Sequence, residues 1–460
     1  MQGKSSTYIM LAVLITAFLT PFTGSAINLA VPAMSKDLNA STVTLTWMST
    51  GFLLSSAALL LPVGKLADIY GRKKVFSIGV AIFGLSSLGC GIAPNTIILL
   101  TMRILQGIGG ACVFSTGMAM LTTAFPAEVR GKILGINAGV VYIGVSAGPV
   151  LGGLITHSLS WRYIFYISFG LTLLAQFATL RIKEAPQRRT SGGFNLYASV
   201  LYSLGLIGTM YGIAAINDGW LPRISLIIGI ILLAMFIAQD MKTEAPLFNI
   251  RTFIGNRVFI NSNLAALISY AATSGLGFLI SLYLQLVKGL NPALAGTVML
   301  AQPAVMALVA PYSGRLSDRL EPQKVATWGM IFTAMGLMIF FFLHGDSPLY
   351  WVVIGLMVTG FGFSLFGPPN NNAIMSSVPP SQFGLAASTL STARLVGQTL
   401  SMTMVTLIIA TIIGNVKPSP QQAPQIILTL RITMALFVIL TIPGIIASQS
   451  RGKVHQTTTD

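Results

Sequence analysis

Hydrophobic residues lie along this 460-residue chain in long runs instead of short alternating segments. Each run has about 20 residues or more, enough for an α-helix to cross the roughly 30 Å hydrocarbon core of a bilayer. The runs lack period-two alternation and are too long for the strands of a membrane barrel. We therefore predict an all-α membrane protein whose fourteen spans cover 7–31, 43–64, 75–93, 97–122, 132–155, 162–181, 196–216, 223–240, 258–287, 293–314, 325–343, 349–372, 384–413 and 425–447.

Charged residues are scarce and are placed asymmetrically. They make up 8% of the chain, against about 25% in soluble domains. The net charge of +16 raises the question of nucleic-acid binding, but the position of the charges argues against it. Basic clusters fall in alternate connections, at Lys65–Lys74, Arg130–Lys132, Arg181–Arg189, Lys242–Arg257 and Arg315–Lys324. The intervening connections hold Lys36, Arg162, Arg223, Lys288 and Lys417.

This asymmetry follows the positive-inside rule, which places both termini in the cytoplasm. We expect a multi-pass protein of the cytoplasmic membrane that has the lipid bilayer and no nucleic acid as its partner.

Two polar connections divide the chain. They are 181–193, which we interpret as a linker, and 242–257, which we expect to form a short interfacial helix. The predicted parts are a six-helix bundle (1–182), a linker with two further spans (183–241), an interfacial segment (242–257) and a second six-helix bundle with a tail (258–460). The bundles echo each other in GKLADIYGRKK (64–74) and GRLSDRLEPQK (314–324). Duplicated bundles are typical of secondary transporters, which bind substrate between the halves.

Residues for enzymatic chemistry are few. Cys90 and Cys112 lie inside predicted helices, where a thiol is usually a small core residue. His157, His344 and His455 are scattered, and no phosphate-binding GxxxxGK[ST] motif occurs. We expect no metal, no cofactor and no enzymatic activity.

An acidic residue stands near the end of the second predicted helix. Asp68 is unfavourable at the negative end of the helix dipole unless it is paired, and Arg72 and Lys73 can reach it. We interpret the pair as a gate that must open for the two halves to move apart, with Asp318 and Arg130 as a related cluster; the alternative is charge that serves topology alone.

These motifs resemble the major facilitator superfamily. GKLADIYGRKK is similar to its loop motif GxLaDrxGrkxx, RILQGIGG (103–110) to RxxQGxGG, and GVSAGPVLGG (144–153) to the antiporter motif GxxxGPxxGG. The fourteen spans, NLAVP (28–32), WRYIF (161–165) and PPNNNAIMSSVP (368–379) resemble its fourteen-helix drug–proton antiporter branch. The resemblance implies two pseudo-symmetric six-helix bundles plus two inserted helices.

The run 144–153 has glycines four residues apart, which form a smooth ridge for close helix approach, and Pro149 permits a bend. We assign this helix to gating, with ordinary small-residue packing as the alternative. The predicted gating residues are Gly64, Asp68, Gly71, Arg72, Lys73, Arg130, Gly144, Gly148, Pro149, Gly152, Gly153, Gly314 and Asp318.

Polar residues inside spans suggest a cavity. Arg103 is costly to bury and therefore functional by default, and Gln106 lies on the same helix face; a structural link to neighbouring carbonyls is the alternative. Arg394 and Gln398 repeat this spacing. The predicted cavity residues are Thr20, Thr23, Asn28, Arg103, Gln106, Tyr142, Gln285, Gln302, Arg394 and Gln398.

The first helix departs from the antiporter pattern. Aligning Asn28 and Pro32 leaves Thr23 where the branch usually has Asp. Threonines at 16, 20 and 23 share a face and form a hydroxyl-lined wall, unless they bond to their own helix. All 11 Asp and Glu lie at loops or helix ends. The cavity is therefore expected to be neutral to positive, which favours neutral or anionic substrates over lipophilic cations.

The leading hypothesis is a monomeric secondary transporter that exports small amphipathic organic compounds by alternating access, with protons as a candidate coupling ion. A facilitator or symporter of a neutral or anionic metabolite is the alternative within this class. A membrane sensor without transport activity is the alternative from another class, although it has no need of the gate motifs.

Overall fold

The computed structural model describes residues 2–182, 193–243, 246–248, 250–379 and 382–452. Within these ranges the chain is helical and contains no strand. Fourteen helical stretches are long and apolar enough to cross a membrane, which confirms the predicted fold class. The chain divides into two compact units: unit 1 is 1–250 with 414–418, and unit 2 is 251–413 with 419–460. The predicted domain boundaries stay a prediction.

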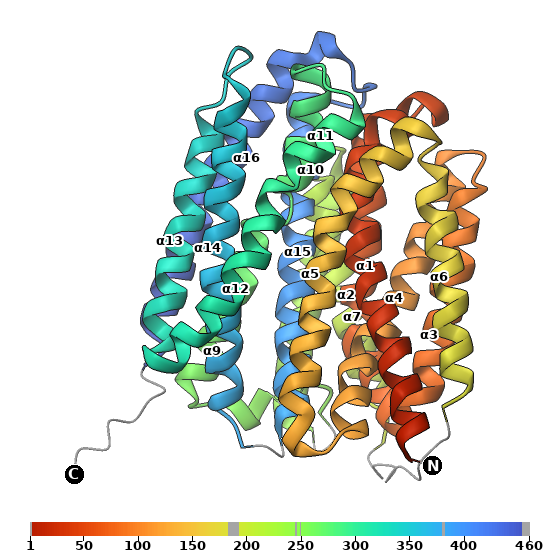
Figure 1. Cartoon of the computed structure of the whole chain (residues 1–460), viewed down its shortest axis with the longest axis vertical. Coiled ribbons are helices and arrows are strands. Elements are labelled where there is room, and N and C mark those ends of the chain that lie inside the picture. Colours follow the sequence, from red (N-terminus) through yellow and green to blue (C-terminus); the bar gives the residue numbers. More distant parts are fainter. Residues whose placement is uncertain (1, 183–192, 244–245, 249, 380–381, 453–460) are drawn as a thin grey trace. The chain divides into compact units, whose positions relative to one another are not determined.

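Unit 1 contains eight long helices, shown in red to yellow-green in Figure 1. They are α1 (Gln2–Leu38), α2 (Thr42–Tyr70), α3 (Arg72–Gly91), α4 (Thr96–Ala124), α5 (Ala127–Ser158), α6 (Arg162–Leu180), α7 (Leu196–Ala214) and α8 (Trp220–Lys242). Helix α1 packs against α5 and α6, whereas α4 packs against α2 and α3. The inserted pair is a hairpin in which α8 packs mainly on α7, and α7 contacts α2.

Unit 2 begins after Ile250, the first residue of the 3-10 turn η1 (Ile250–Phe253). Its elements are α9 (Arg257–Ala271), α10 (Leu276–Leu282), the π-helical turn η2 (Tyr283–Val287), α11 (Pro292–Met299), α12 (Ala301–Arg319), α13 (Pro322–Phe341), α14 (Leu349–Ser376), α15 (Phe383–Ile412), the 3-10 turn η4 (Pro420–Gln422) and α16 (Ala423–Gln449). In Figure 1, α13 lies beside α14 and α16, which agrees with their packing.

The span at 257–287 is interrupted, which its unbroken hydrophobicity does not predict. Helix α9 ends at Ala271, and the backbone N–H of Gly275 donates to Ser401 Oγ of α15 at 2.9 Å. A Cβ at Gly275 would lie 2.5 Å from Val405 Cγ2, so the close approach requires glycine. Irregular backbone at membrane depth persists where protein groups satisfy it, and Ser401 does so here.

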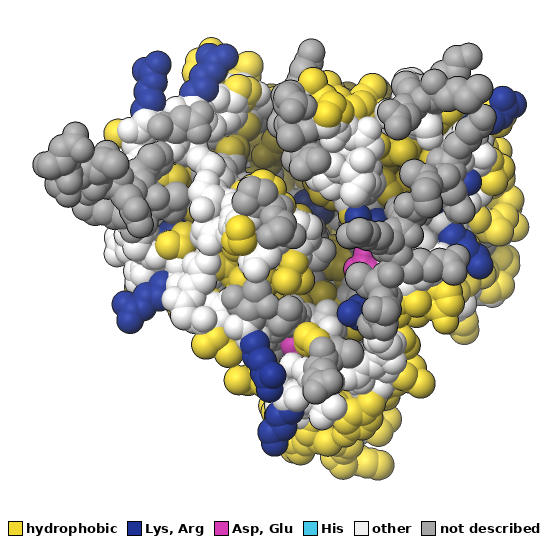
Figure 2. All heavy atoms as spheres, turned by 90° about the horizontal axis from the view of Figure 1, so that it is seen from below, with side chains coloured by type: hydrophobic (Ala, Val, Ile, Leu, Met, Phe, Trp, Pro, Cys, Tyr) yellow, Lys and Arg dark blue, Asp and Glu magenta, His cyan; other side chains and the backbone are white. Residues whose placement is uncertain are grey.

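Among the charged side chains on the face drawn in Figure 2, Lys and Arg are far more frequent than Asp and Glu. On the described part of the chain, two ion pairs form, Asp68 with Arg72 and Asp37 with Arg162, and all four side chains are partly exposed. The buried side chains of the helices are almost all apolar or uncharged polar ones.

Candidate functional site

Unit 1 contains a buried cation. Arg103 of α4 is 2% exposed. Its Nε donates to the Met48 carbonyl oxygen of α2 at 3.0 Å, its Nη1 donates to Gln106 Oε1, and its guanidinium lies 4.5 Å from the Phe52 ring centroid. Within the described residues Arg103 forms no ion pair. A carbonyl, an amide and an aromatic face thus stabilise its charge.

Gln106 extends this network to a third helix. Its Nε2 donates to Ser87 Oγ of α3 at 2.7 Å, and the side chain is fully buried. Helix α4 can come so close to α2 because Gly107 has no side chain, and a Cβ there would lie 2.4 Å from the Phe52 carbonyl oxygen. The predicted pair Arg103–Gln106 therefore connects α2, α3 and α4, as the structural alternative requires. Its contribution to a substrate cavity stays a prediction.

The threonines of α1 bond to their own helix. Thr20 Oγ1 donates to the Thr16 carbonyl at 2.9 Å, and Thr23 Oγ1 donates to the Leu19 carbonyl at 2.8 Å. Thr23 Oγ1 also lies 3.1 Å from Ser168 Oγ of α6. Thr23 is therefore a buried link between α1 and α6. Asn28, one turn further along, is half-buried.

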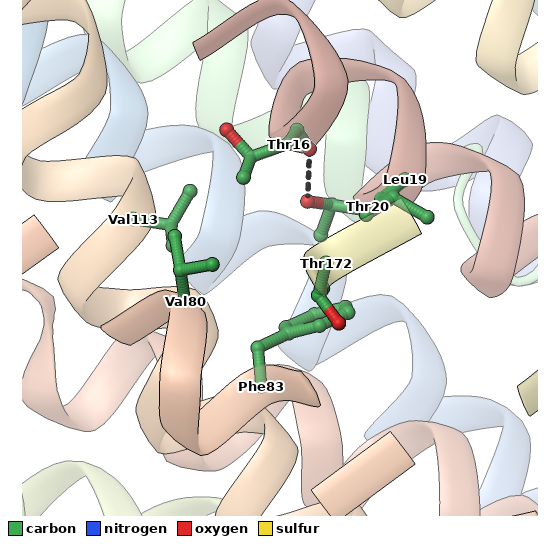
Figure 3. Close-up of a pocket in the computed structure, with 7 residues that line it drawn as sticks. All are labelled: Thr16, Leu19, Thr20, Val80, Phe83, Val113 and Thr172. Atoms are coloured by element: carbon green, nitrogen blue, oxygen red, sulfur yellow. Dashed lines mark hydrogen bonds between the residues drawn. The ribbon is translucent and has the colours of Figure 1, made fainter. Parts of the chain in front are cut away.

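A small pocket opens beside these threonines. Figure 3 shows Thr16 and Thr20 of α1 facing Val80 and Phe83 of α3. Leu19, Val113 of α4 and Thr172 of α6 complete the lining. The pocket has room for about one water molecule. It brings predicted cavity residue Thr20 to an internal space of unit 1, but an organic substrate requires far more volume.

The predicted gate pair forms at the junction of α2 and α3. Arg72 Nε and Nη2 both donate to Asp68 Oδ1 at 3.1 Å. Gly71 between the helices has φ +104, a conformation that favours glycine. Lys73 is half-buried, Gly64 lies against Ser115, and Gly314 has open space around it. The side chains of Arg130 and Asp318 lie outside the described part of the structure.

The glycine ridge of α5 is pressed against α1. Added Cβ atoms would lie 2.5 Å from the Phe18 carbonyl oxygen at Gly144 and 2.6 Å from the Ala26 Cα at Gly152. At Gly148 the added atom would overlap Ser25 Oγ. Pro149 and Gly153 are buried in the same stretch. The three glycines thus bring the two backbones into direct contact, and any larger residue would force the helices apart.

The remaining predicted cavity residues are half-buried and dispersed. Tyr142 belongs to α5 of unit 1, while Gln285, Gln302, Arg394 and Gln398 belong to unit 2. Gln285 Nε2 donates to Ser281 Oγ at 2.9 Å. The Gln302 backbone packs against α14, where a Cβ at Gly360 would lie 2.5 Å from its carbonyl oxygen. Arg394 and Gln398 share one face of α15 at i and i+4.

A second buried cation lies where the sequence suggested a solvated tail. Arg451, just after α16, is 0% exposed. Its Nη1 donates to Asn370 Oδ1 of α14 at 3.1 Å and to Ser262 Oγ of α9 at 3.3 Å. Nε and Nη2 donate to the Ser448 carbonyl and hydroxyl. Burial lowers the pKa of Arg451 to about 10, so the side chain remains a cation at neutral pH.

Arg451 was missed because SQSRGK (448–453) has the polar pattern of a terminal tail. Three polar residues inside or beside predicted spans could have pointed to it: Asn370, which belongs to the segment PPNNNAIMSSVP, Ser262 and Ser448. They come together only in the folded unit.

Two carboxylates in unit 1 form hydrogen bonds that hold helix ends in place. Asp240, near the end of α8, is 1% exposed and accepts from the backbone N–H groups of Leu247 and Phe248 at 2.7 and 3.0 Å. Asp37 accepts from Trp161 Nε1 at 3.0 Å and pairs with Arg162 at the start of α6. The sequence placed both acids at helix ends correctly but did not indicate that Asp240 is buried.

Among the described residues no group of three His, Cys, Asp or Glu side chains could hold a metal ion. The assembly of membrane-length helices, buried uncharged polar groups and tightly packed glycine helices in the described residues defines a multi-pass helical membrane protein.

Comparison with known proteins identifies the family. A model of the Major Facilitator Superfamily matches residues 13–402, so the chain belongs to this superfamily of transporters. It is 30% identical over 393 residues to the riboflavin transporter RibZ of Clostridioides difficile, covering 85% of each chain. It is 28% identical over 390 residues to the multidrug resistance protein Stp of Mycobacterium tuberculosis, covering 84% of this chain and 72% of Stp.

Among solved structures, an auto-inhibited peptide transporter of the POT family superposes with a TM-score of 0.72, at 15% identity and 99% coverage of this chain. That likeness shows the fold alone. The resemblance inferred from the motifs is confirmed, and the family and the relatives are transporters, not enzymes.

Proposed function

We propose that this protein is a secondary transporter of the cytoplasmic membrane that exports small amphipathic organic compounds by alternating access. The observation that carries the proposal is the direct backbone contact between α1 and α5 at Gly144, Gly148 and Gly152. Such a contact closes the space between α1 and α5 without interlocking side chains, so the two helices can slide along each other. The similarity to multidrug resistance protein Stp supports export as its direction.

We further propose that the substrate is neutral or anionic. Arg103 places a positive charge deep within unit 1, and Thr23 stands where a carboxylate would favour cations. A buried cation that is surrounded by neutral acceptors raises the local potential, which an anionic or strongly polar neutral ligand lowers. The similarity to a riboflavin transporter favours the second candidate function, a facilitator or symporter of a neutral or anionic metabolite.

The Asp68–Arg72 pair is the proposed cytoplasmic gate. Both side chains are partly exposed, and an exposed ion pair stabilises by about 1 kcal/mol or less. Such a contact can open and close in each transport cycle. An even number of spans returns the chain to its starting side, and with the basic connections inside, both termini are cytoplasmic.

A transport assay in proteoliposomes tests the function. We would compare riboflavin, an anionic dye and the lipophilic cation ethidium, each with and without an imposed pH gradient. Movement of riboflavin or the dye in excess of protein-free vesicles is expected. Proton-gradient-driven exchange of ethidium alone would overturn the proposed substrate class, and the acids Asp218 and Asp240 would then be the first coupling residues to examine.

The same assay tests the gate. Asp68→Asn removes the ion pair but keeps the side-chain shape, so turnover is expected to fall to background while the amount of folded protein is unchanged. Turnover at the wild-type rate would show that the pair serves topology and not gating.

A further inference from the structure

Helix α2 contains a proline, and a neighbouring helix compensates for the hydrogen bond that this proline removes. Pro62 stands eight residues before the end of α2 and has no N–H to donate to the Ala58 carbonyl one turn back. Both Ala58 and its neighbour Ala57 are fully buried. In a membrane interior no bulk water can satisfy such a carbonyl, so leaving it without a donor is costly.

The inserted hairpin supplies the missing donor. Ser203 Oγ of α7 donates to the Ala58 carbonyl at 2.7 Å. The preceding residue, Tyr202, is 5% exposed and donates from its hydroxyl to the Ala57 carbonyl at 2.9 Å. The hydroxyls of two consecutive α7 residues thus donate to two consecutive carbonyls of α2, five and four residues before the proline.

The hairpin itself is built to hold α7 in place. A Cβ at Gly212 of α7 would lie 2.6 Å from the Leu226 backbone nitrogen of α8, and one at Gly229 of α8 would lie 2.4 Å from the Thr209 nitrogen. The rings of Tyr202 and Phe236 are 5.3 Å apart. The aromatic ring that carries one of the two donating hydroxyls is therefore packed between both helices of the hairpin.

Unit 2 contains a similar hydrogen bond to a carbonyl that a proline has released, and here the donor does not come from the α7–α8 hairpin. Pro368 of α14 leaves the Ser364 carbonyl without its helical donor, and Ser313 Oγ of α12 donates to that carbonyl at 2.6 Å. Ser313 directly precedes Gly314, the first residue of the second gate-like motif. In each unit, a serine hydroxyl from a neighbouring helix satisfies the carbonyl that a proline has released.

We propose that Ser203 and Tyr202 are positioning residues for the gate, and that the α7–α8 hairpin acts as a brace for the proline bend of α2. Pro62 lies six residues before Asp68, so any bend that the proline permits sets where the Asp68–Arg72 pair stands. This role rests on the proposed gating function of Asp68. It gives the two inserted helices a mechanical task that needs no contact with substrate.

A double-mutant cycle tests the brace directly. Ser203→Ala orphans the Ala58 carbonyl, whereas Pro62→Ala restores the backbone N–H that the serine replaces. Hydrogen exchange of an α2 peptide spanning residues 58–66 is therefore expected to rise about tenfold in Ser203→Ala. In the Pro62→Ala background the same serine substitution is expected to have no effect. Ser199→Ala is the matched control, since this buried α7 serine donates to its own Asn195 carbonyl.

Coupling to the gate has a separate readout. Cys90 and Cys112 are replaced by alanine, Tyr70→Cys is added beside Asp68, and its maleimide labelling rate is measured. Ser203→Ala is expected to change this rate about threefold or more, and Ser199→Ala to leave it unchanged.

The brace would be overturned if Ser203→Ala raised hydrogen exchange equally in the wild-type and Pro62→Ala backgrounds. It would also be overturned if Ser199→Ala raised exchange as much as Ser203→Ala does. Altered exchange with unaltered labelling would overturn its positioning role. If Asp68→Asn leaves the Tyr70→Cys labelling rate unchanged, the proposed gate fails by itself, and the exchange result still decides whether the hairpin supports the bend.

Discussion

Each unit of this transporter buries one guanidinium almost completely, and the two are held very differently. Arg103 lies about two turns inside the start of α4, where its contacts are a backbone carbonyl, an amide and the face of Phe52. Arg451 follows the end of α16 and donates to side chains or carbonyls of α9, α14 and its own helix. Neither forms an ion pair within the described residues.

The two buried arginines differ in the role that their burial indicates. Near the end of a span, an arginine can extend to water at small cost, so Arg451 turns inward because three helices offer it acceptors. Arg103 is buried inside a span, and within the described residues no counterion offsets the cost of burying its charge. A buried charge that is costly inside a span indicates function, whereas one that links helix ends indicates structure.

The largest expected effect follows from removing the charge in unit 1. Arg103→Met keeps much of the side-chain volume but leaves Gln106 Oε1 without its donor, at about 1–3 kcal/mol, so the thermal midpoint is expected to fall by a few degrees and binding is measured well below it. Loss of a buried, hydrogen-bonded charge that contacts ligand costs about 2–5 kcal/mol, so substrate affinity is expected to fall about 30-fold or more. Binding of the substrate identified in the vesicle assay, measured by calorimetry, checks this.

Gln106→Ala is the matched control for that experiment. It removes the link to Ser87 but leaves the cation, so it is expected to weaken binding less than Arg103→Met. A larger effect from Gln106→Ala would show that the network positions helices and that its charge does not meet the substrate.

In unit 2 the expected effect falls on stability. Arg451→Ala leaves Asn370 Oδ1 and the hydroxyl of Ser262 without their donor, at about 1–3 kcal/mol for each orphaned group. The thermal midpoint is expected to fall by several degrees, and transport per folded molecule to remain near wild type. Arg451→Lys keeps the charge but lacks the planar fork, so its midpoint should lie between the two. Loss of transport without loss of stability would reverse the comparison.

The pH dependence of this contribution has a defined sign. Burial lowers the pKa of Arg451 from its ordinary value to about 10, so the unfolded chain holds the proton more tightly than the folded chain does. The charge therefore costs stability at all pH values below about 10, and the cost is relieved only as the pH rises above that. Between about pH 6 and 9 the midpoint difference between wild type and Arg451→Ala is expected to be constant.

The two arginines also mark what the sequence could reveal. The spans follow from hydrophobic length alone because a bilayer forces every backbone group into a helix, and Arg103 was found because a cation inside a span is conspicuous. Arg451 lies beyond the last span among polar residues, where the same residue type is usually solvated. The burial of Arg451 depends on Ser262 and Asn370, which are distant in sequence, so no local sequence pattern predicts that burial.

The threonines of α1 show a second limit. Their spacing predicted a polar face, which exists, but spacing does not tell whether a hydroxyl bonds to its own helix or to a cavity. Thr20 donates to the Thr16 carbonyl and still borders the small pocket, so both alternatives hold at one residue. The interruption at Gly275 was hidden for a similar reason, since its hydrogen-bond partner Ser401 belongs to a distant helix.

A smaller effect is expected from adding a carboxylate to the interior of unit 1. Thr23→Asp introduces an acid at a buried position beside Ser168 Oγ. The negative charge lowers the potential that Arg103 creates, so affinity for an anionic substrate is expected to fall about tenfold and weak ethidium binding to appear. Thr23→Asn, of the same shape and uncharged, is the control. Equal behaviour of the two variants would mean that the site does not sense charge at position 23.

The smallest effect comes from giving the cation of unit 2 its own counterion. Asn370→Asp replaces the amide oxygen that accepts from Arg451 Nη1 by a carboxylate oxygen. The charge-assisted bond is stronger than the one it replaces, but burying the carboxylate offsets much of that gain. A net stabilisation below about 1 kcal/mol remains, which corresponds to a midpoint rise of about 1–3 °C. Asn371→Asp, on the exposed side of α14, should give no rise. Because Arg451 is assigned to structure, transport should be unchanged in both variants; a loss of transport in Asn370→Asp alone would mean that its positive charge, like that proposed for Arg103, takes part in the transport cycle.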